Sequence, residues 1–208
     1  MKRILLIGGG GHCHSVIDSI IRTGYYDEIG IVDDKEGHYD GISVVGQDKD
    51  IGSLRSNGWE YAFVTVGSIG DTTTRRRLYS MIKEEGFNIP SIIDPSAILA
   101  DSATVAKGSF VGKGAIINSV CRIGECAIVN SGAVIEHDCT IGSFAHVSSG
   151  AVICGDVKIG DDTHIGAGSV VRQSVIIGSG SLIGVGSVIT KDIPDNMKGF
   201  GNPFKVIE

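Results

Sequence analysis

The stretch VNSGAVIEHDCTIGSFAHV, residues 129–147, carries the pattern that decides the fold. An aliphatic residue recurs at every sixth position, at Val129, Ile135, Ile141 and Val147. This period fits neither the 3.6-residue repeat of an α-helix nor the two-residue alternation of an ordinary strand. The frame continues without a break in both directions, through Ile93, Leu99, Val105, Val111, Ile117 and Ile123 on one side and Ile153, Ile159, Ile165, Val171, Ile177, Ile183 and Ile189 on the other.

The other positions of the six-residue unit are also regular. A small residue stands four positions after most of the aliphatic ones, as at Ala115, Ala133 and Ala151, and a glycine often follows directly, as at Gly124 and Gly142. This combination is typical of the hexapeptide class of left-handed parallel β-helix, in which three units complete one coil of a triangular prism. We therefore predict an all-β, left-handed parallel β-helix over residues 93–208. The frame breaks at Asp195, and residues 199–203 are expected to form a terminal loop.

Composition and charge exclude several classes of protein. The formal net charge is −6 and the basic residues are scattered, which argues against a nucleic-acid partner. The one basic run, Arg75 to Arg77, is expected on a solvated helix face. The apolar stretch near the N-terminus stops at Gly8, so neither export nor a membrane span is indicated.

The five cysteines form no CxxC motif and have no metal-like pairing with histidine. This usage fits a reducing cytoplasm and argues against disulfides and against a zinc site. We expect a cytoplasmic protein without a metal. In the repeat frame Cys121 and Cys139 take the place of the small inward residue, which favours a packing role for both.

The first 92 residues follow a different pattern. Apolar runs at residues 2–7, 29–32 and 61–66 predict buried strands, and helical patterns follow at 16–21 and 72–85. Strands that alternate with helices indicate a parallel sheet. We predict an α/β Rossmann-like domain over residues 1–92.

Glycines 8–11 join the first strand to the first helix, where backbone N–H groups can approach a phosphate, and Asp33 and Asp34 end the second strand. The dinucleotide fingerprint GxGxxG is incomplete, because Cys13 occupies its last position. We therefore favour a nucleoside-diphosphate ligand over a nicotinamide cofactor. A tight turn that binds nothing is the open alternative.

Three histidines of the repeat region suggest chemistry. Glu136-His137-Asp138 places an imidazole between two carboxylates on an outward position, and a carboxylate fixes the tautomer of a histidine that acts as general base. His146 and His164 are one coil apart, so they should stack in adjacent coils. No role follows for His164, and an exposed corner position is favoured.

His137 and His146 are half a coil apart and should lie on opposite sides of one prism. If both act in catalysis, one protomer's His137 must face its partner's His146. A homotrimer of prisms would supply three such clefts, and a groove between parallel prisms suits the extended pantetheine of coenzyme A.

Together these residues resemble the PglD/NeuD group of sugar acyltransferases, in which a nucleotide-sugar domain precedes a left-handed β-helix. The resemblance spans the whole chain. The pieces that carry it are Ile7-Gly8-Gly9-Gly10-Gly11-His12, Val32-Asp33-Asp34, Val66-Gly67, residues 134–139, Ala145-His146-Val147-Ser148 and residues 201–205.

The resemblance implies a role for each matching residue. His137 would be the catalytic base and Asp138 its carboxylate partner, although some relatives carry Glu there and Glu136 could compete. Acetyl-CoA would be the co-substrate, bound by His146, Gly155, Gly166 and Gly184. The nucleotide-sugar would be held by Gly11, His12, Cys13, Asp33, Asp34 and Gly67, with His14 as a departure from relatives that carry a smaller residue.

The resemblance further implies an N-acetyltransferase that acts on the 4-amino group of a UDP-linked amino-dideoxy sugar in bacterial-type glycan biosynthesis. O-acetylation of a sialic acid is the nearest competing function, because it can use the same fold and base. A non-catalytic trimeric scaffold and a nucleotide-dependent oxidoreductase are two further hypotheses. Binding of coenzyme A and of NAD, respectively, would discriminate these two from the acetyltransferase.

Overall fold

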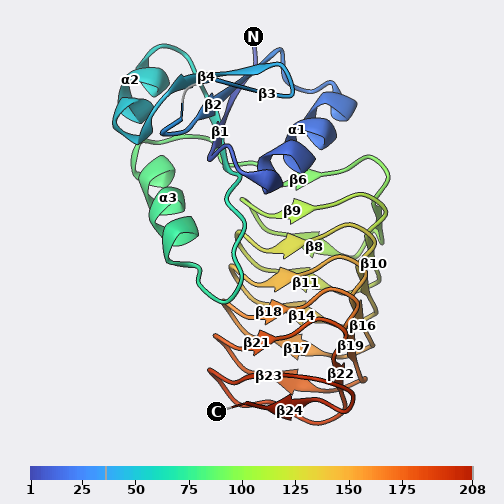
Figure 1. The fold of residues 1–208 in the computed structure, drawn as a ribbon. Helices are drawn as coiled ribbons and strands as arrows, with labels where there is room; N and C mark the ends of the chain where they lie inside the picture. Colours follow the sequence, from blue (N-terminus) through green and yellow to red (C-terminus); the bar gives the residue numbers. More distant parts are fainter. Residues whose placement is uncertain (36, 208) are drawn as a thin grey trace.

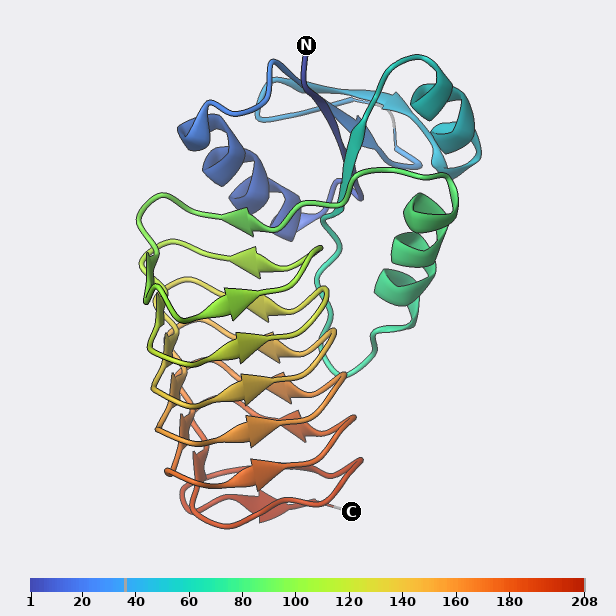
Figure 2. The same ribbon diagram turned by 180° about the vertical axis from the view of Figure 1, so that it is seen from behind.

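A computed structural model describes residues 1–35 and 37–207 of the chain. An α/β domain sits on one end of a long prism of stacked coils (Figure 1). The loop between β5 and α3 descends along the side of the prism, and α3 runs back up beside it (Figure 2). Along the described chain no helix is long and apolar enough to cross a membrane.

The N-terminal sheet has the strand order β3-β4-β2-β1-β5, and all of its pairings except β3 with β4 are parallel. The strands β1 and β2 are joined by a helix, as the sequence predicts. The elements are β1 Arg3–Ile7, α1 Gly11–Thr23, β2 Glu28–Val32, β3 His38–Tyr39, β4 Ile42–Gly46, η1 Asp48–Asp50, α2 Ile51–Ser56, β5 Tyr61–Val64 and α3 Thr73–Glu84.

Strand β1 is buried on both faces, which explains its continuous apolar run. Leu5 and Ile7 pack in one core with residues of α2 and α3. Ile4 and Leu6 pack on the other side, with residues of α1 and with Phe110 of the β-helix. The second core therefore joins the two halves of the molecule.

The prism consists of three parallel sheets, and its strands are two residues long throughout the repeat. The first sheet contains β6 Ile92–Ile93, β9 Phe110–Val111, β12 Ile128–Val129, β15 His146–Val147, β18 His164–Ile165, β21 Leu182–Ile183, β23 Lys198–Phe200 and β24 Lys205–Val206. The second contains β7 Ile98–Leu99, β10 Ile116–Ile117, β13 Val134–Ile135, β16 Val152–Ile153, β19 Val170–Val171 and β22 Val188–Ile189. The third contains β8 Thr104–Val105, β11 Arg122–Ile123, β14 Thr140–Ile141, β17 Lys158–Ile159 and β20 Ile176–Ile177.

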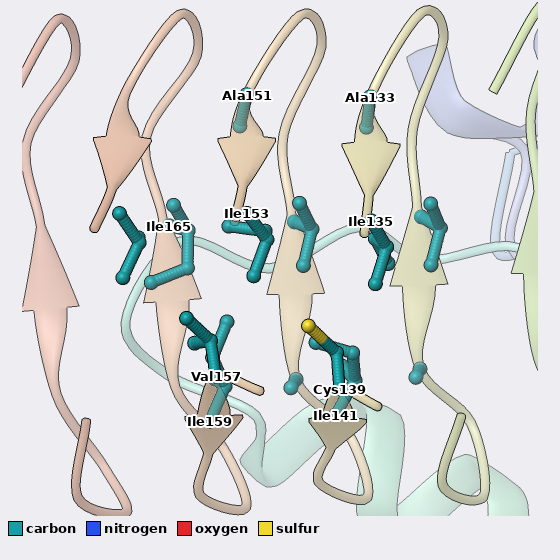
Figure 3. Close-up of a cluster of buried hydrophobic side chains, with 14 of the residues drawn as sticks. Ala133, Ile135, Cys139, Ile141, Ala151, Ile153, Val157, Ile159 and Ile165 are labelled. Atoms are coloured by element: carbon teal, nitrogen blue, oxygen red, sulfur yellow. The ribbon is translucent and has the colours of Figure 1, made fainter. Parts of the chain in front are cut away.

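The repeat residues fill the inside of the prism. Ile135 and Ile153 are fully buried and pair in register in successive coils, with the small residues Ala133 and Ala151 beside them (Figure 3). Cys139 lies in the same core, where burial raises the pKa of its thiol to about 12. All five cysteines are free thiols. These positions confirm the predicted fold class, a Rossmann-like α/β domain followed by a parallel β-helix.

The outward-pointing residues differ between the three sheets, and we name the three faces of the prism after them. The covered face, on the β6-to-β24 sheet, carries Ile92, Phe110, Ile128, His146, His164 and Leu182. The aliphatic face, on the β7-to-β22 sheet, carries Ile98, Ile116, Val134, Val152, Val170 and Val188. The polar face, on the β8-to-β20 sheet, carries Thr104, Arg122, Thr140, Lys158 and, at its end, Ile176.

Two sequence-based expectations about local structure are met only in part. The end of the repeat is not only a loop, because Lys198–Phe200 forms β23, which pairs with β21 in parallel and with β24 in antiparallel. The hexapeptide pattern ends there, but the backbone still forms strand hydrogen bonds with the last coil.

The basic run is a solvated helix face only in part, because Arg76 and Arg77 are exposed but Arg75 is buried. Arg75 is 4% exposed and donates to the main-chain carbonyls of Phe144 and Cys126, whereas Arg76 forms a two-pronged ion pair with Asp162 at 2.7 and 2.8 Å. Helix α3 is thereby fastened to the side of the prism, which no pattern local to the helix reveals.

Candidate functional site

His137 lies at the corner between the aliphatic and polar faces, two residues after the end of β13. Its Nδ1–H donates to Oδ2 of Asp138 over 2.9 Å, which leaves Nε2 as the acceptor nitrogen. Asp138 has a φ of 62°, so the turn itself directs the carboxylate back toward the ring. Both side chains are exposed. This arrangement can accept a proton from a bound substrate, and Asp138 rather than Glu136 is the partner.

Gly155 occupies the same corner one coil further on. Its backbone is buried beneath the His137 ring, since a Cβ built on it would lie 2.6 Å from Cε1 and 2.7 Å from Nε2. The structure therefore brings Gly155 to His137, whereas His146 of the same chain lies on another face.

His146 lies half-buried on the covered face, under the loop of residues 65–72. Its Nδ1–H donates to the Ser68 carbonyl over 3.1 Å, and its Nε2 lies 3.4 Å from the Asn130 amide nitrogen, from which it accepts. Burial lowers the pKa of His146 to about 4, so the ring is neutral near pH 7.

His164 pairs with His146 in register in the next coil, as predicted, and the two ring centroids are 4.8 Å apart with the rings perpendicular. The expected exposed position is wrong, since His164 is 7% exposed. The loop from the N-terminal domain covers this part of the prism. The repeat pattern does not reveal this burial, because the contact is between residues far apart in the sequence. Nε2 of His164 lies 3.3 Å from the Ser148 hydroxyl, and burial lowers the pKa of the ring.

His12 completes a histidine cluster with His146 and His164 between the two domains. Its ring meets Phe110 edge-on at a centroid distance of 5.0 Å. Burial, and then the nearby His146, lower the pKa of His12 to about 3. Its Nε2 is buried and has no hydrogen-bond partner within residues 1–35 and 37–207. The imidazole thus faces the domain interface.

The glycine loop has room for a ligand at the N-terminus of α1. The helix begins at Gly11 after Gly10, without a side-chain cap, and no atom lies within 4 Å of a Cβ built on either glycine. Free N–H groups at such a helix end attract phosphate. Gly67 lies beside His12, across from this loop.

The two acidic residues after β2 have different surroundings. Asp33 accepts from the Gly9 N–H at 2.6 Å and from the Lys35 N–H at 2.9 Å, so its carboxylate holds the loops together. Asp34 is exposed and lines, with Asp33, a cavity of about 150 Å³. The Arg77 guanidinium, 3.0 Å from the Asp48 carboxylate, forms part of its wall.

The remaining predicted site residues, Cys13, Gly166 and Gly184, are packed against other residues of the protein. Cys13 is fully buried in the core under α1, where burial raises the pKa of its thiol to about 11. Gly166 lies against the backbone of Gly184, and Gly184 against Phe200. Close stacking of coils therefore suffices to explain these two glycines.

Sequence reasoning missed three residues that shape the site, namely Ser68, Asn130 and Arg75. The first two set the tautomer of His146, and the guanidinium of Arg75 helps to keep it neutral. Their contacts join positions far apart in the sequence, so no spacing signals them. Among the described residues no group of three or more His, Cys, Asp or Glu could hold a metal ion.

Comparisons with known proteins agree with this architecture. Residues 3–82 match the family model of the PglD N-terminal domain, and residues 156–191 match the bacterial transferase hexapeptide model of six repeats. No curated protein sequence matches the chain.

Three solved structures illustrate the similarity. A point mutant of perosamine N-acetyltransferase from Caulobacter crescentus, in complex with CoA and GDP-perosamine, is 33% identical with a TM-score of 0.95, over 100% of this chain and 98% of that one. The acetyltransferase domain of PglB from Neisseria gonorrhoeae, in complex with acetyl coenzyme A, is 34% identical with a TM-score of 0.94, over 99% of both chains. WeeI from Acinetobacter baumannii, 22% identical with a TM-score of 0.88 over 100% of both chains, shares the fold. The chain therefore belongs to the PglD/NeuD-like sugar acyltransferases of the hexapeptide-repeat superfamily and is an acyltransferase.

Proposed function

We propose that this protein transfers an acetyl group from acetyl-CoA to the 4-amino group of a nucleotide-linked amino-dideoxy sugar. The observation that carries the proposal is the His137–Asp138 pair, exposed at a corner of the prism with Nε2 of His137 free to accept a proton. Support for the substrate class comes from the whole-length similarity to a perosamine N-acetyltransferase that binds CoA and GDP-perosamine.

In the proposed reaction the amine attacks the thioester carbonyl, so a C–N bond forms and the C–S bond breaks. Nε2 of His137 takes the proton from the amine nitrogen and returns it to the departing thiolate. The negative charge of Asp138 stabilises the imidazolium that exists between these two transfers. No covalent enzyme intermediate is needed, because holding both substrates in one cleft supplies much of the rate.

The tetrahedral intermediate needs a donor for its oxyanion. The Nδ1–H of His146 is already used by the Ser68 carbonyl, so we assign this role to the Gly155 N–H, which donates to no group among the described residues. His146, with the Asn130 amide, would then contact the acetyl end of the thioester. Gly166 and Gly184 would line the same groove further along the prism.

At the acceptor end, the free N–H groups of the Gly10–Gly11 turn would bind the diphosphate. Asp34 would face the nucleoside, with Asp33 positioning the loop. The resemblance of the sequence favours uridine, whereas the similarity to the Caulobacter structure favours guanosine. Both nucleotides therefore belong in the first assay.

That assay measures release of coenzyme A thiol from acetyl-CoA. The acceptors are UDP- and GDP-linked 4-amino-4,6-dideoxy sugars and, separately, free and CMP-linked sialic acid. We expect release with a nucleotide-linked amino sugar and with neither sialic acid. Release with sialic acid alone would replace the proposed N-acetylation with O-acetylation.

The same proposal includes a homotrimer with active sites between protomers. The six outward residues of the aliphatic face are Ile or Val, and Ile98 and Val170 are 63% and 37% exposed. The equivalent positions of the polar face carry Thr, Arg, Thr, Lys and Ile. His137 stands at one edge of the aliphatic face, and the covered face with His146 begins at its other edge. Packing copies through this face would bring one protomer's His137 toward the His146 of the partner subunit.

Mixed assemblies test the shared site. The variants His137→Ala and His146→Ala are co-expressed with different tags, and the mixed trimers are purified through both tags. A cleft formed by the two intact residues should restore a fraction of the activity that neither variant has alone. Failure to restore activity in verified mixed trimers would place both residues in one protomer's site. Val152→Asp should prevent assembly in size-exclusion chromatography with light scattering, and Lys158→Asp, one sheet away, is the control.

A further inference from the structure

We infer that Gly155 is a positioning residue for the proposed base, because only a residue without a side chain lets the His137 ring lie this close to the backbone of the next coil. This inference rests on the proposed role of His137. It concerns the side chain that Gly155 lacks and is independent of its N–H group.

The corner position that Gly155 occupies recurs once in every coil. Backbone hydrogen bonds stack these positions, from Asp138 N to Ser119 O, from Asp156 N to His137 O and from Ser174 N to Gly155 O. The coil before His137 carries Ser119 at this position, and the coil after Gly155 carries Gln173. Both side chains are exposed, so the corner accepts a side chain elsewhere.

Backbone conformation does not explain the glycine. Gly155 lacks the positive φ that the corner imposes on the following residue, Asp156, where φ is 56°. A side chain could therefore be attached without backbone strain. The nearest obstacle to a Cβ is the ring of His137, with Cε1 at 2.6 Å, Nε2 at 2.7 Å and Nδ1 at 3.2 Å.

All three of these atoms belong to the proposed base. A methyl group at Gly155 must push the ring away from the coil, and the motion pulls Nδ1 from its 2.9 Å hydrogen bond to Asp138. The absence of a side chain at Gly155, in the next coil, therefore helps to hold His137 Nε2 in its orientation. Displacement of a reacting group by about 1 Å can cost up to about a hundredfold in rate.

The test compares Gly155→Ala with wild type under saturating substrates. We expect kcat to fall by about 10- to 100-fold while the KM for acetyl-CoA changes by less than about twofold. Gly155→Gln, which copies the side chain of Gln173, should lose more. Asp101→Ala, at the same corner position two coils before His137, should keep wild-type kcat. A raised KM with unchanged kcat would overturn the inference.

A double variant separates this inference from the proposed function. In a His137→Ala background, adding Gly155→Ala should cause no further loss of kcat, because there is no ring to displace. An additional loss of similar size would show that Gly155 acts by another route. If His137→Ala alone kept full activity, the proposed base would be wrong, whatever Gly155 does.

The ring can also be observed directly. The Cε1–H signal of His137, identified by its disappearance in His137→Ala, should shift in the NMR spectrum of Gly155→Ala and stay in place in Asp101→Ala. An unshifted signal in Gly155→Ala would contradict the displacement, even if activity fell.

Discussion

His137 and the histidine cluster, of which His146 and His164 lie on the same prism as His137, have opposite environments. His137 is exposed and paired with a carboxylate, whereas His12, His146 and His164 are packed between domains and have lowered pKa values. Within the described part of the chain none of these three histidines is hydrogen-bonded to a carboxylate. The first arrangement suits a group that gains and loses a proton, and the second suits groups that keep one tautomer. Exposure, burial and hydrogen-bond partners thus give the histidines of one chain different chemical properties.

The largest expected effect comes from the exposed histidine. His137→Ala should lower kcat by about 10²- to 10⁴-fold, the range typical of a lost general base. The melting temperature and the affinity for acetyl-CoA, measured by calorimetric titration, should stay at their wild-type values because the ring lies outside the core. A variant that binds acetyl-CoA poorly and turns over normally would refute the assignment.

The carboxylate partner gives a smaller loss. Asp138→Asn should reduce kcat by about 10- to 100-fold, since the amide carries no charge to stabilise the imidazolium. Asn tolerates the left-handed φ of 62°, so the turn should be preserved. Glu136→Gln is the matched control and should stay within about twofold of wild type. A larger loss in Glu136→Gln than in Asp138→Asn would exchange their roles.

The histidine cluster should make the free energy of unfolding depend on pH. The pKa of His146 is about 4 in the folded chain and about 6.5 when unfolded, so below about pH 6.5 the unfolded chain binds the extra proton. Stability should therefore be complete above about pH 6.5 and fall by about 1–3 kcal/mol on acidification to about pH 4. Thermal denaturation between pH 7 and pH 4.5 measures this.

His164→Leu, which repeats the Leu182 of the next coil, should flatten that dependence at unchanged kcat. The matched control is His38→Leu, an exposed histidine of the N-terminal domain, which should keep the wild-type slope. Equal slopes in all three proteins would exclude His164 as a contributor to the acid sensitivity.

The smallest effect is expected from Arg76, one of the residues through which α3 contacts the side of the prism. Arg76→Ala removes a partly exposed ion pair with Asp162 and should cost at most about 1 kcal/mol. Arg75→Met should cost more, because two buried carbonyls lose their donor. Chemical denaturation of both variants measures the difference, and a reversed order would mean that α3 is held mainly by its surface charges.

The repeat was sufficient to predict the prism because a single inward residue per unit determines each strand. The glycine loop and His137 with Asp138 were equally accessible, since their contacts are local in sequence. The stacking of His146 and His164 in adjacent coils was also predicted, but their burial was not, because it depends on contacts of residues 65–72 with coils that lie more than fifty residues later in the sequence. The burial of Arg75 escaped prediction for the same reason. Gly155 did leave a signal, as a glycine at a corner position where neighbouring coils carry side chains.

The antiparallel pairing of β24 with β23 affects how the strand edge at the end of one sheet of the prism can associate with another molecule. Stacked parallel coils end in open strand edges, onto which another molecule could add and propagate a fibre. Here the last coil is followed by a short strand of reversed direction that carries Lys205, and the first coil lies beneath α1. At the C-terminal end the reversed strand therefore covers the last coil only in the β6-to-β24 sheet, and at the other end α1 lies over the first coil, so end-to-end addition of a second prism is disfavoured at these two places.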